Sequence, residues 1–190
     1  MKKVLINSMI IWLPLSAAIT LSFAVLYLTL QQNIRMAAND LPYHEALDVR
    51  NSLVKGGTPQ QVIAPYKQLN LSSSHSAFVI IADQQGTVAS SATLSGHAPL
   101  IPSDALQNAG ENGINSITWQ PANGIRNAIV ILPYATAGGR GYVIAGQSLI
   151  EGEKRMTILS TIIFTGLVLI SIVSLVITIL FQYCKIIRVV

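Results

Sequence analysis

Two long runs without charge flank a middle segment of mixed polarity. No charged residue occurs at positions 4–34 or 156–184. A hydrocarbon core about 30 Å thick is crossed by roughly 20 helical residues, so each run is long enough to span a bilayer. We predict membrane helices at residues 9–30 and 157–181. Pro14 in the first run is compatible with this, because neighbouring groups in membrane helices can satisfy the carbonyl that a proline frees.

The first run also begins like a signal peptide, because Lys2 and Lys3 precede it. However, the run is longer than the apolar core of about 7–15 residues that signal peptides have, and no A-x-A cleavage site follows it. We therefore interpret it as an uncleaved anchor.

The pattern beyond the first run predicts further helix. Residues 31–38 contain no breaker and extend the helix as a stalk. Asn39 or Asp40 can cap a new helix, with Pro42 in its first turn, where a missing N–H costs nothing. The apolar face of this segment continues to about Val54.

Three later segments also favour helix. Thr58 and Gln61 have the spacing of a capping box, which predicts the start of a short helix. Ser103 can cap another short helix over residues 104–108. From Ser148 onward the chain returns to helix and leads into the second span.

The remaining pattern is that of strands. Segments of strand length, bounded by turns, occupy residues 77–82, 87–90, 115–120, 125–134 and 140–147. The turn from Asp83 to Gly86 joins the first two as a hairpin. Short connections imply antiparallel pairing. With helices at its ends and on one side, the sheet makes an α+β fold.

Charge predicts the orientation of the chain. Residues 31–155 carry eight basic and eight acidic residues, so the net charge of +4 lies entirely on the two tails. Its carriers are Lys2, Lys3, Lys185 and Arg188. By the positive-inside rule, tails 1–8 and 182–190 are cytoplasmic and the domain at 31–156 is exported. The high pI is then a topology signal, and we expect no nucleic-acid partner.

Motifs of catalysis and cofactor binding are absent from the sequence. It contains no H-E-x-x-H, no G-x-S-x-G and no glycine-rich phosphate loop, so we expect no enzyme. His44, His75 and His97 are far apart and lack ligand spacing, so we expect no metal or cofactor. The only cysteine, Cys184, follows the second span, and the exported domain therefore has no disulfide.

Four residues near the strand ends are candidates for a ligand site. Arg126 and Arg140 can pair with an anionic group, and Trp119 or Tyr134 can form an apolar wall. The competing interpretation is structural, with the arginines as solvated edge charges and the tryptophan in the core.

The order of these elements resembles a known family of input domains. Two segments carry the likeness, Phe78–Val88 with its Asp-x-x-Gly turn and Gly141–Leu149 as a last strand that leads back to the membrane. They are similar to the periplasmic PAS-like or single-Cache sensor domains of bacterial two-component sensor histidine kinases. That family has a HAMP, kinase or methyl-accepting region after the second span, whereas this chain ends at Val190. We therefore expect no kinase activity from this chain, which is either the front part of a longer receptor or an accessory protein.

The leading hypothesis is a sensor in the bacterial inner membrane that transmits a signal through its helices. Its surroundings are membrane lipids, and its expected partner is a second copy, paired through the helices, or a separate signalling protein. A small molecule is the candidate ligand. The alternative is an accessory or assembly subunit of an envelope complex that uses the exported domain as a docking surface.

Overall fold

The computed structural model describes residues 2–187. The end of the predicted tail 182–190, including Arg188, lies outside the described residues. The chain divides into two compact units, one made of Met1–Asn33 with Lys154–Val190 and the other of Ile34–Glu153.

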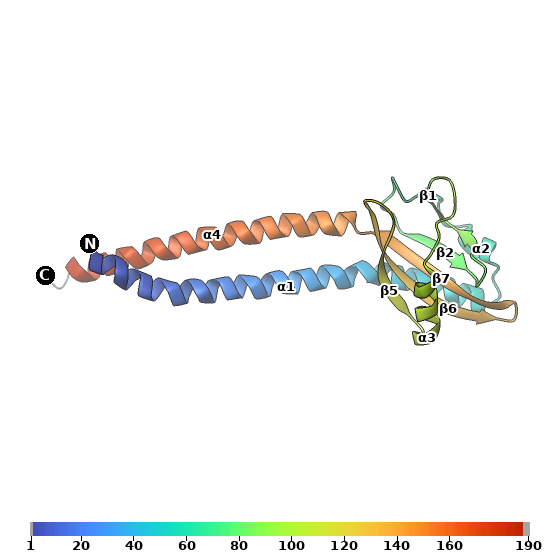
Figure 1. Ribbon diagram of the computed structural model, residues 1–190, viewed down its shortest axis with the longest axis horizontal. Helices are drawn as coiled ribbons and strands as arrows, with labels where there is room; N and C mark the ends of the chain where they lie inside the picture. The colour runs from blue at the N-terminus through green and yellow to red at the C-terminus, as the bar shows by residue number, and fades with distance from the viewer. Residues whose placement is uncertain (1, 188–190) are drawn as a thin grey trace. The chain divides into compact units, whose positions relative to one another are not determined.

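Two long helices contain the apolar runs. Helix α1 extends over Lys2–Val54 and helix α4 over Ile150–Ile187. Each contains an 18-residue stretch apolar enough to cross a membrane, with mean hydropathies of 2.1 in α1 and 2.8 in α4. The two uncharged stretches predicted from the sequence are therefore helical (Figure 1).

Helix α1 is continuous, so the prediction of a new helix start at Asn39 or Asp40 is wrong. Pro42 lies in the helix interior and is buried. The helix can continue through Pro42 because a distant strand supplies a hydrogen bond: Gln147 Nε2 donates to Ala38 O at 2.9 Å. That carbonyl is the one that a proline four residues later leaves without a donor.

The two short helices differ in how well their starts were predicted. Helix α2 (Pro59–Ile63) begins with the expected capping box, in which Gln61 N donates to Thr58 Oγ1 and Thr58 N donates to Gln61 Oε1. Helix α3 (Ser103–Asn112) is longer than predicted. Ser103 is its first residue and not its cap, because Pro102 occupies the cap position.

A five-stranded antiparallel sheet forms the centre of the second unit. Its strands are β2 (Phe78–Ala82), β3 (Thr87–Ser90), β5 (Asn115–Ala122), β6 (Ile125–Thr136) and β7 (Gly139–Ser148). Their order is β3-β2-β7-β6-β5, so the predicted hairpins and the α+β class are confirmed. Two short strands that the sequence did not reveal, β1 (Leu69–Asn70) and β4 (Ala92–Thr93), pair in parallel beside it.

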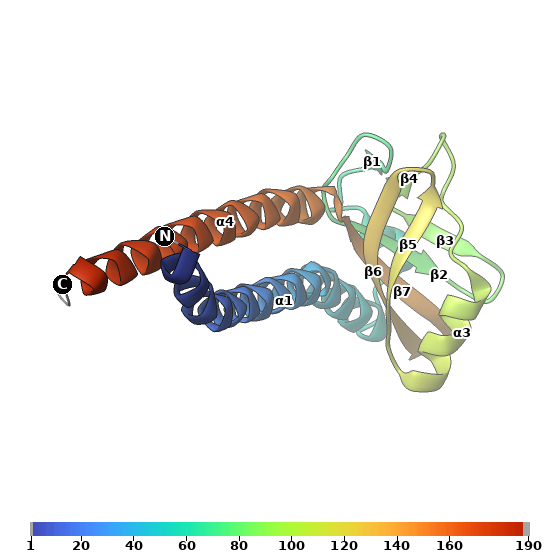
Figure 2. The same ribbon diagram turned by 60° about the vertical axis from the view of Figure 1, so that its left-hand side comes forward.

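Both faces of the sheet are covered, whereas the sequence predicted cover at the ends and on one side. Alternation along β2 separates two cores. Phe78 and Ile80 belong to the core that also contains buried residues of α3, and Val79 and Ile81 to the core that contains residues of α1 and α2. Figure 2 shows α3 on one side of the sheet. The central strands β2, β6 and β7 are consequently buried on both faces.

Candidate functional site

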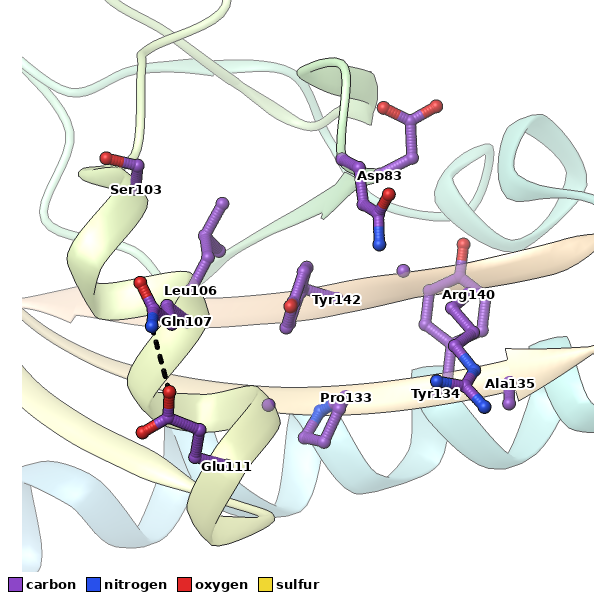
Figure 3. Close-up of a pocket in the computed structure, with 13 residues that line it drawn as sticks. Asp83, Ser103, Leu106, Gln107, Glu111, Pro133, Tyr134, Ala135, Arg140 and Tyr142 are labelled. Atoms are coloured by element: carbon purple, nitrogen blue, oxygen red, sulfur yellow. Dashed lines mark hydrogen bonds between the residues drawn. The ribbon is translucent and has the colours of Figure 1, made fainter.

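A groove of about 710 Å³ opens where the β2–β3 turn, helix α3 and the ends of β6 and β7 meet (Figure 3). Its walls combine two aromatic rings, several polar side chains and three charged groups. It is lined by Asp83, Gln84, Ser103, Leu106, Gln107, Gly110, Glu111, Pro133, Tyr134, Ala135, Arg140, Gly141 and Tyr142. Neither a single strand nor α3 alone forms it, so the groove depends on the assembled sheet.

Tyr134 is held against the neighbouring strand by a glycine. It lies opposite Gly141 in the β6–β7 pair. A Cβ at Gly141 would lie 2.8 Å from the Tyr134 ring and 2.6 Å from Ala82 O. Burial raises the pKa of the Tyr134 hydroxyl, and the negative charge of Asp83 raises it further. Tyr134 is thus a neutral hydrogen-bonding group with a fixed ring.

Tyr142 stands in the middle of the groove, between α3 and the side formed by Tyr134 and Arg140 (Figure 3). Its hydroxyl oxygen lies 3.1 Å from the position that a Cβ at Gly110 would take. The missing side chain on α3 therefore makes room for this ring. Tyr142 is partly exposed and presents an aromatic surface to a molecule in the groove.

The charged groups of the groove differ in how they are held. Asp83 Oδ1 accepts hydrogen bonds from Gln85 N at 2.8 Å and Gly86 N at 2.9 Å, so this carboxylate stabilises its own turn. Glu111 accepts a hydrogen bond from Gln107. Arg140 is exposed, and among residues 2–187 no carboxylate forms a salt bridge with it. The guanidinium of Arg140 is therefore available to an anion.

The same hairpin end has a second groove on another side. It has a volume of about 490 Å³ and shares Asp83, Tyr134 and Arg140 with the first groove. The end of α1, the start of α2 and the glycine-rich β6–β7 turn complete it. The Tyr134–Arg140 end of the hairpin is thus accessible from two grooves.

The structure brings together two of the four predicted ligand residues. Tyr134 and Arg140 line the same groove. Trp119 is buried instead, with its ring centroid 6.3 Å from that of Phe78. Arg126 forms a salt bridge with Glu153 at the start of α4. Trp119 therefore belongs to the core, as the structural interpretation expected, whereas Arg126 is paired with a carboxylate and is not the solvated edge charge of that interpretation.

Sequence reasoning missed Tyr142 as a groove residue. It lies two residues after Arg140 and therefore on the same face of β7, which is the signal that a strand pattern offers. The contributions of Gly110 and Glu111 had no such signal, because only the packing of α3 on the sheet brings them to β7.

The opposite ends of the two central strands contact helices. Gln147 of β7 donates to Ala38 O of α1, as described above. At the start of β6, Arg126 O accepts a hydrogen bond from Leu149 N at 2.9 Å. The side chain of Arg126 forms a salt bridge with Glu153 of α4. Strands β6 and β7 therefore line the groove at one end and contact α1 and α4 at the other end.

Within the first unit, the two helices are joined by a polar contact. Trp12 Nε1 donates to Ser174 Oγ at 3.0 Å and to Ser171 O at 3.2 Å. Further along the pair, a Cβ at Gly166 would lie 3.4 Å from the Phe23 ring. The Trp12 indole thus connects α1 to α4 by hydrogen bonds.

In the part of the chain that the structure describes, no group of three or more histidine, cysteine, aspartate or glutamate residues could hold a metal ion. No protein-family model matches the chain, and no curated protein matches it.

Proposed function

We propose that the chain is a two-pass sensor of the bacterial inner membrane. Its PAS-like domain is periplasmic, and both tails are cytoplasmic. The length and hydropathy of α1 and α4 support the two spans. The net charge of +4, carried by the tails alone, supports the orientation. The α+β class and the antiparallel five-stranded sheet support the PAS-like resemblance.

One observation carries the sensing function: β6 and β7 run from the groove to the helix contacts. Along β6, Tyr134 in the groove and Arg126 at the α4 contact are eight residues apart, about 26 Å at the rise of a strand. The strand between them is buried on both faces. Close-packed interiors transmit displacement because they have few voids to absorb it. A ligand that moves the groove end of β6 or β7 therefore acts on α1 and α4.

The groove favours a small anion with an apolar portion. Arg140 offers a planar set of donors suited to a carboxylate. Tyr142 offers an aromatic wall, and the Tyr134 hydroxyl a further hydrogen bond. The acidic residues Asp83 and Glu111 disfavour a large polyanion. The chain then binds a ligand and transmits its presence to the helices, with no catalytic step.

The binding test uses the full chain in lipid nanodiscs and a panel of short mono- and dicarboxylic acids. A true ligand at about 100 times its Kd stabilises the folded state by roughly 2.7 kcal/mol and raises the Tm. Arg140→Gln removes this shift, whereas Lys67→Gln, an exposed cation outside the groove, retains it. The binding proposal fails if no acid raises the Tm, or if the two variants respond alike.

The orientation has a separate test, because Cys184 is the only cysteine. A membrane-impermeant maleimide applied to cells with a permeabilised outer membrane should leave Cys184 unlabelled until the inner membrane is opened. In a Cys184→Ser background, Ser73→Cys should be labelled at once. The reverse pattern would place the domain in the cytoplasm and contradict the proposed topology.

A second candidate, a docking subunit, is favoured by the edge strand β5. This strand carries no charged residue, and its outer positions expose Ser116, Thr118 and Gln120. Natural edge strands are protected by charge, proline or bulges, and β5 has Pro121 and an irregular register only at its end, so its uncharged first part can accept a strand from a partner. Thr118→Lys should then remove a stoichiometric envelope partner that Ser72→Lys, in an exposed loop, retains.

A further inference from the structure

Pro42 creates a defect in the middle of α1. In an α-helix the carbonyl of residue 38 accepts from the N–H of residue 42, and proline has no N–H. Pro42 is fully buried, so the defect lies against the domain. A backbone carbonyl that lacks its helical donor in such a place needs another partner. The helix is nevertheless continuous through this point.

Gln147 supplies the missing donor. Its Nε2 lies 2.9 Å from Ala38 O, in a partly buried contact between residues 109 positions apart. The side-chain amide thus stands in for the backbone N–H that Pro42 lacks. The repair comes from β7 and not from the helix itself, so the local structure of α1 depends on where β7 lies.

The position of Gln147 connects this repair to the groove. Gly141, Val143, Ala145 and Gln147 follow the same face of β7, which is the face toward α1. Tyr134 packs over the first of them at the groove end. Val143 and Ala145 are completely buried between the two ends. The Tyr134 end and the Gln147 end of this face are therefore joined by a buried stretch of β7.

We propose that the Gln147 amide is a releasable clamp on α1. While it donates to Ala38 O, the helix is continuous across Pro42. When β7 withdraws it, the carbonyl is freed and α1 opens over residues 38–42. The trigger, occupancy of the groove, rests on the proposed sensing function; the clamp itself does not.

Three substitutions at Gln147 and Pro42 test the hydrogen bond between Gln147 and Ala38 O. Gln147→Glu keeps the shape but replaces the donor by an ionised acceptor, which repels a carbonyl oxygen. Gln147→Asn keeps the amide but is one methylene shorter. Pro42→Ala returns the backbone N–H to the helix and makes the side-chain donor unnecessary. These changes allow a double-mutant cycle in which the two positions are coupled only if the clamp exists.

The test measures amide hydrogen exchange of the full chain in nanodiscs, at residues 39–45 and, as an internal control, residues 49–53. One net hydrogen bond corresponds to about a fivefold change in an opening constant. Gln147→Glu and Gln147→Asn should each speed exchange about fivefold at 39–45 and little at 49–53. After Pro42→Ala, the same changes at Gln147 should have less than about a twofold effect.

Equal effects of the Gln147 variants with and without Pro42 would overturn the clamp. If Pro42→Ala does not fold, the selectivity within α1 decides: equal acceleration at 39–45 and 49–53 means general destabilisation and also overturns it. Failure of the trigger is separate. Suppose that the effects of the Gln147 and Pro42 variants are coupled, but that no carboxylic acid changes hydrogen exchange at residues 39–45. This result would leave the clamp intact and contradict the proposed sensing function.

Discussion

The indole Nε1 of Trp12 lies 3.0 Å from Ser174 Oγ, and this bond joins the two apolar helices. Ser174 Oγ in turn donates to Ser171 O at 2.9 Å. The serine hydroxyl therefore acts as acceptor for one helix and donor within the other. If the two helices span a bilayer as proposed, little water competes for these groups, and the bond can define how the helices align.

Trp12→Phe should weaken the helix pair by about 0.5–2 kcal/mol, the range of interhelical hydrogen bonds in membranes. Reversible unfolding of the full chain in mixed micelles measures this. Ser22→Ala is the control, because Ser22 Oγ donates only to Ala18 O of its own helix and is exposed. Equal stability losses for the two variants would contradict a role for the indole in holding the pair.

The contact between Tyr134 and Gly141 should not tolerate a methyl group. A Cβ there would lie 2.6 Å from Ala82 O, a backbone atom that cannot move freely. Gly141→Ala should cost about 1–3 kcal/mol, as overpacked positions do. For a domain of this size the Tm should fall by about 3–10 °C.

The matched control is Gly138→Ala in the neighbouring turn. A Cβ at Gly138 would meet only Thr136 Oγ1, at an ordinary 3.7 Å. Thermal unfolding should therefore leave the Tm of this variant close to that of the unchanged chain. If Gly141→Ala unfolds at the same temperature as Gly138→Ala, the Tyr134 ring does not need the glycine.

Elements with a local cause were predicted from the sequence. The capping box of Thr58 and Gln61 lies within one helical turn, and its two hydrogen bonds form as expected. The β-branched run from Phe78 to Ala82 is a strand for the same kind of reason. Its position beside β7, however, depends on pairing across more than 60 residues, such as Ile80 with Ile144.

Elements with a distant cause were not predicted. Pro42 indicates a helix start when only its neighbours are considered, and the donor that keeps it inside α1 comes from Gln147. Arg126 has the character of a free strand-end cation until Glu153 is brought to it. The groove has the same limitation, since Tyr142 becomes central to it only after α3 docks with Gly110.

Asn127 has a buried Nδ2 without a hydrogen-bond partner among the described residues. An unsatisfied buried donor costs about 1–3 kcal/mol, and an apolar replacement removes that cost. Asn127→Val should therefore be neutral or stabilise the domain by up to about 1.5 kcal/mol. Valine is also well suited to a strand. Denaturant unfolding of the full chain measures the free-energy change.

Asn115→Val provides the contrast for this prediction. Asn115 Nδ2 donates to Ala105 O at 2.9 Å and thereby connects β5 to α3. Its loss leaves the carbonyl without this donor and should destabilise by about 1–2 kcal/mol. Equal destabilisation by both valine variants would show that the Asn127 amide is satisfied in solution.

Tyr66 makes the stability of the domain sensitive to alkaline pH. Its hydroxyl donates to Glu45 Oε2 at 2.7 Å. Burial is the largest cause that raises the pKa of Tyr66 above its ordinary value of 10.0, followed by this hydrogen bond and by the charges of Glu45 and Asp48. The folded chain therefore holds the phenol proton more tightly than the unfolded chain does.

The stability that the Tyr66 phenol contributes is complete below the pKa of tyrosine in the unfolded chain. It is lost as the pH rises from that value towards the higher pKa of Tyr66 in the folded chain. Tyr66→Phe should thus cost about 0.5–1.5 kcal/mol near neutral pH, and the difference should shrink above about pH 10. Denaturant unfolding at pH values from about 8 to 12 measures it. Tyr43→Phe, at an exposed position of α1, is the control variant. A Tyr66→Phe difference that stays constant across this range would mean that the phenol proton is not held by the fold.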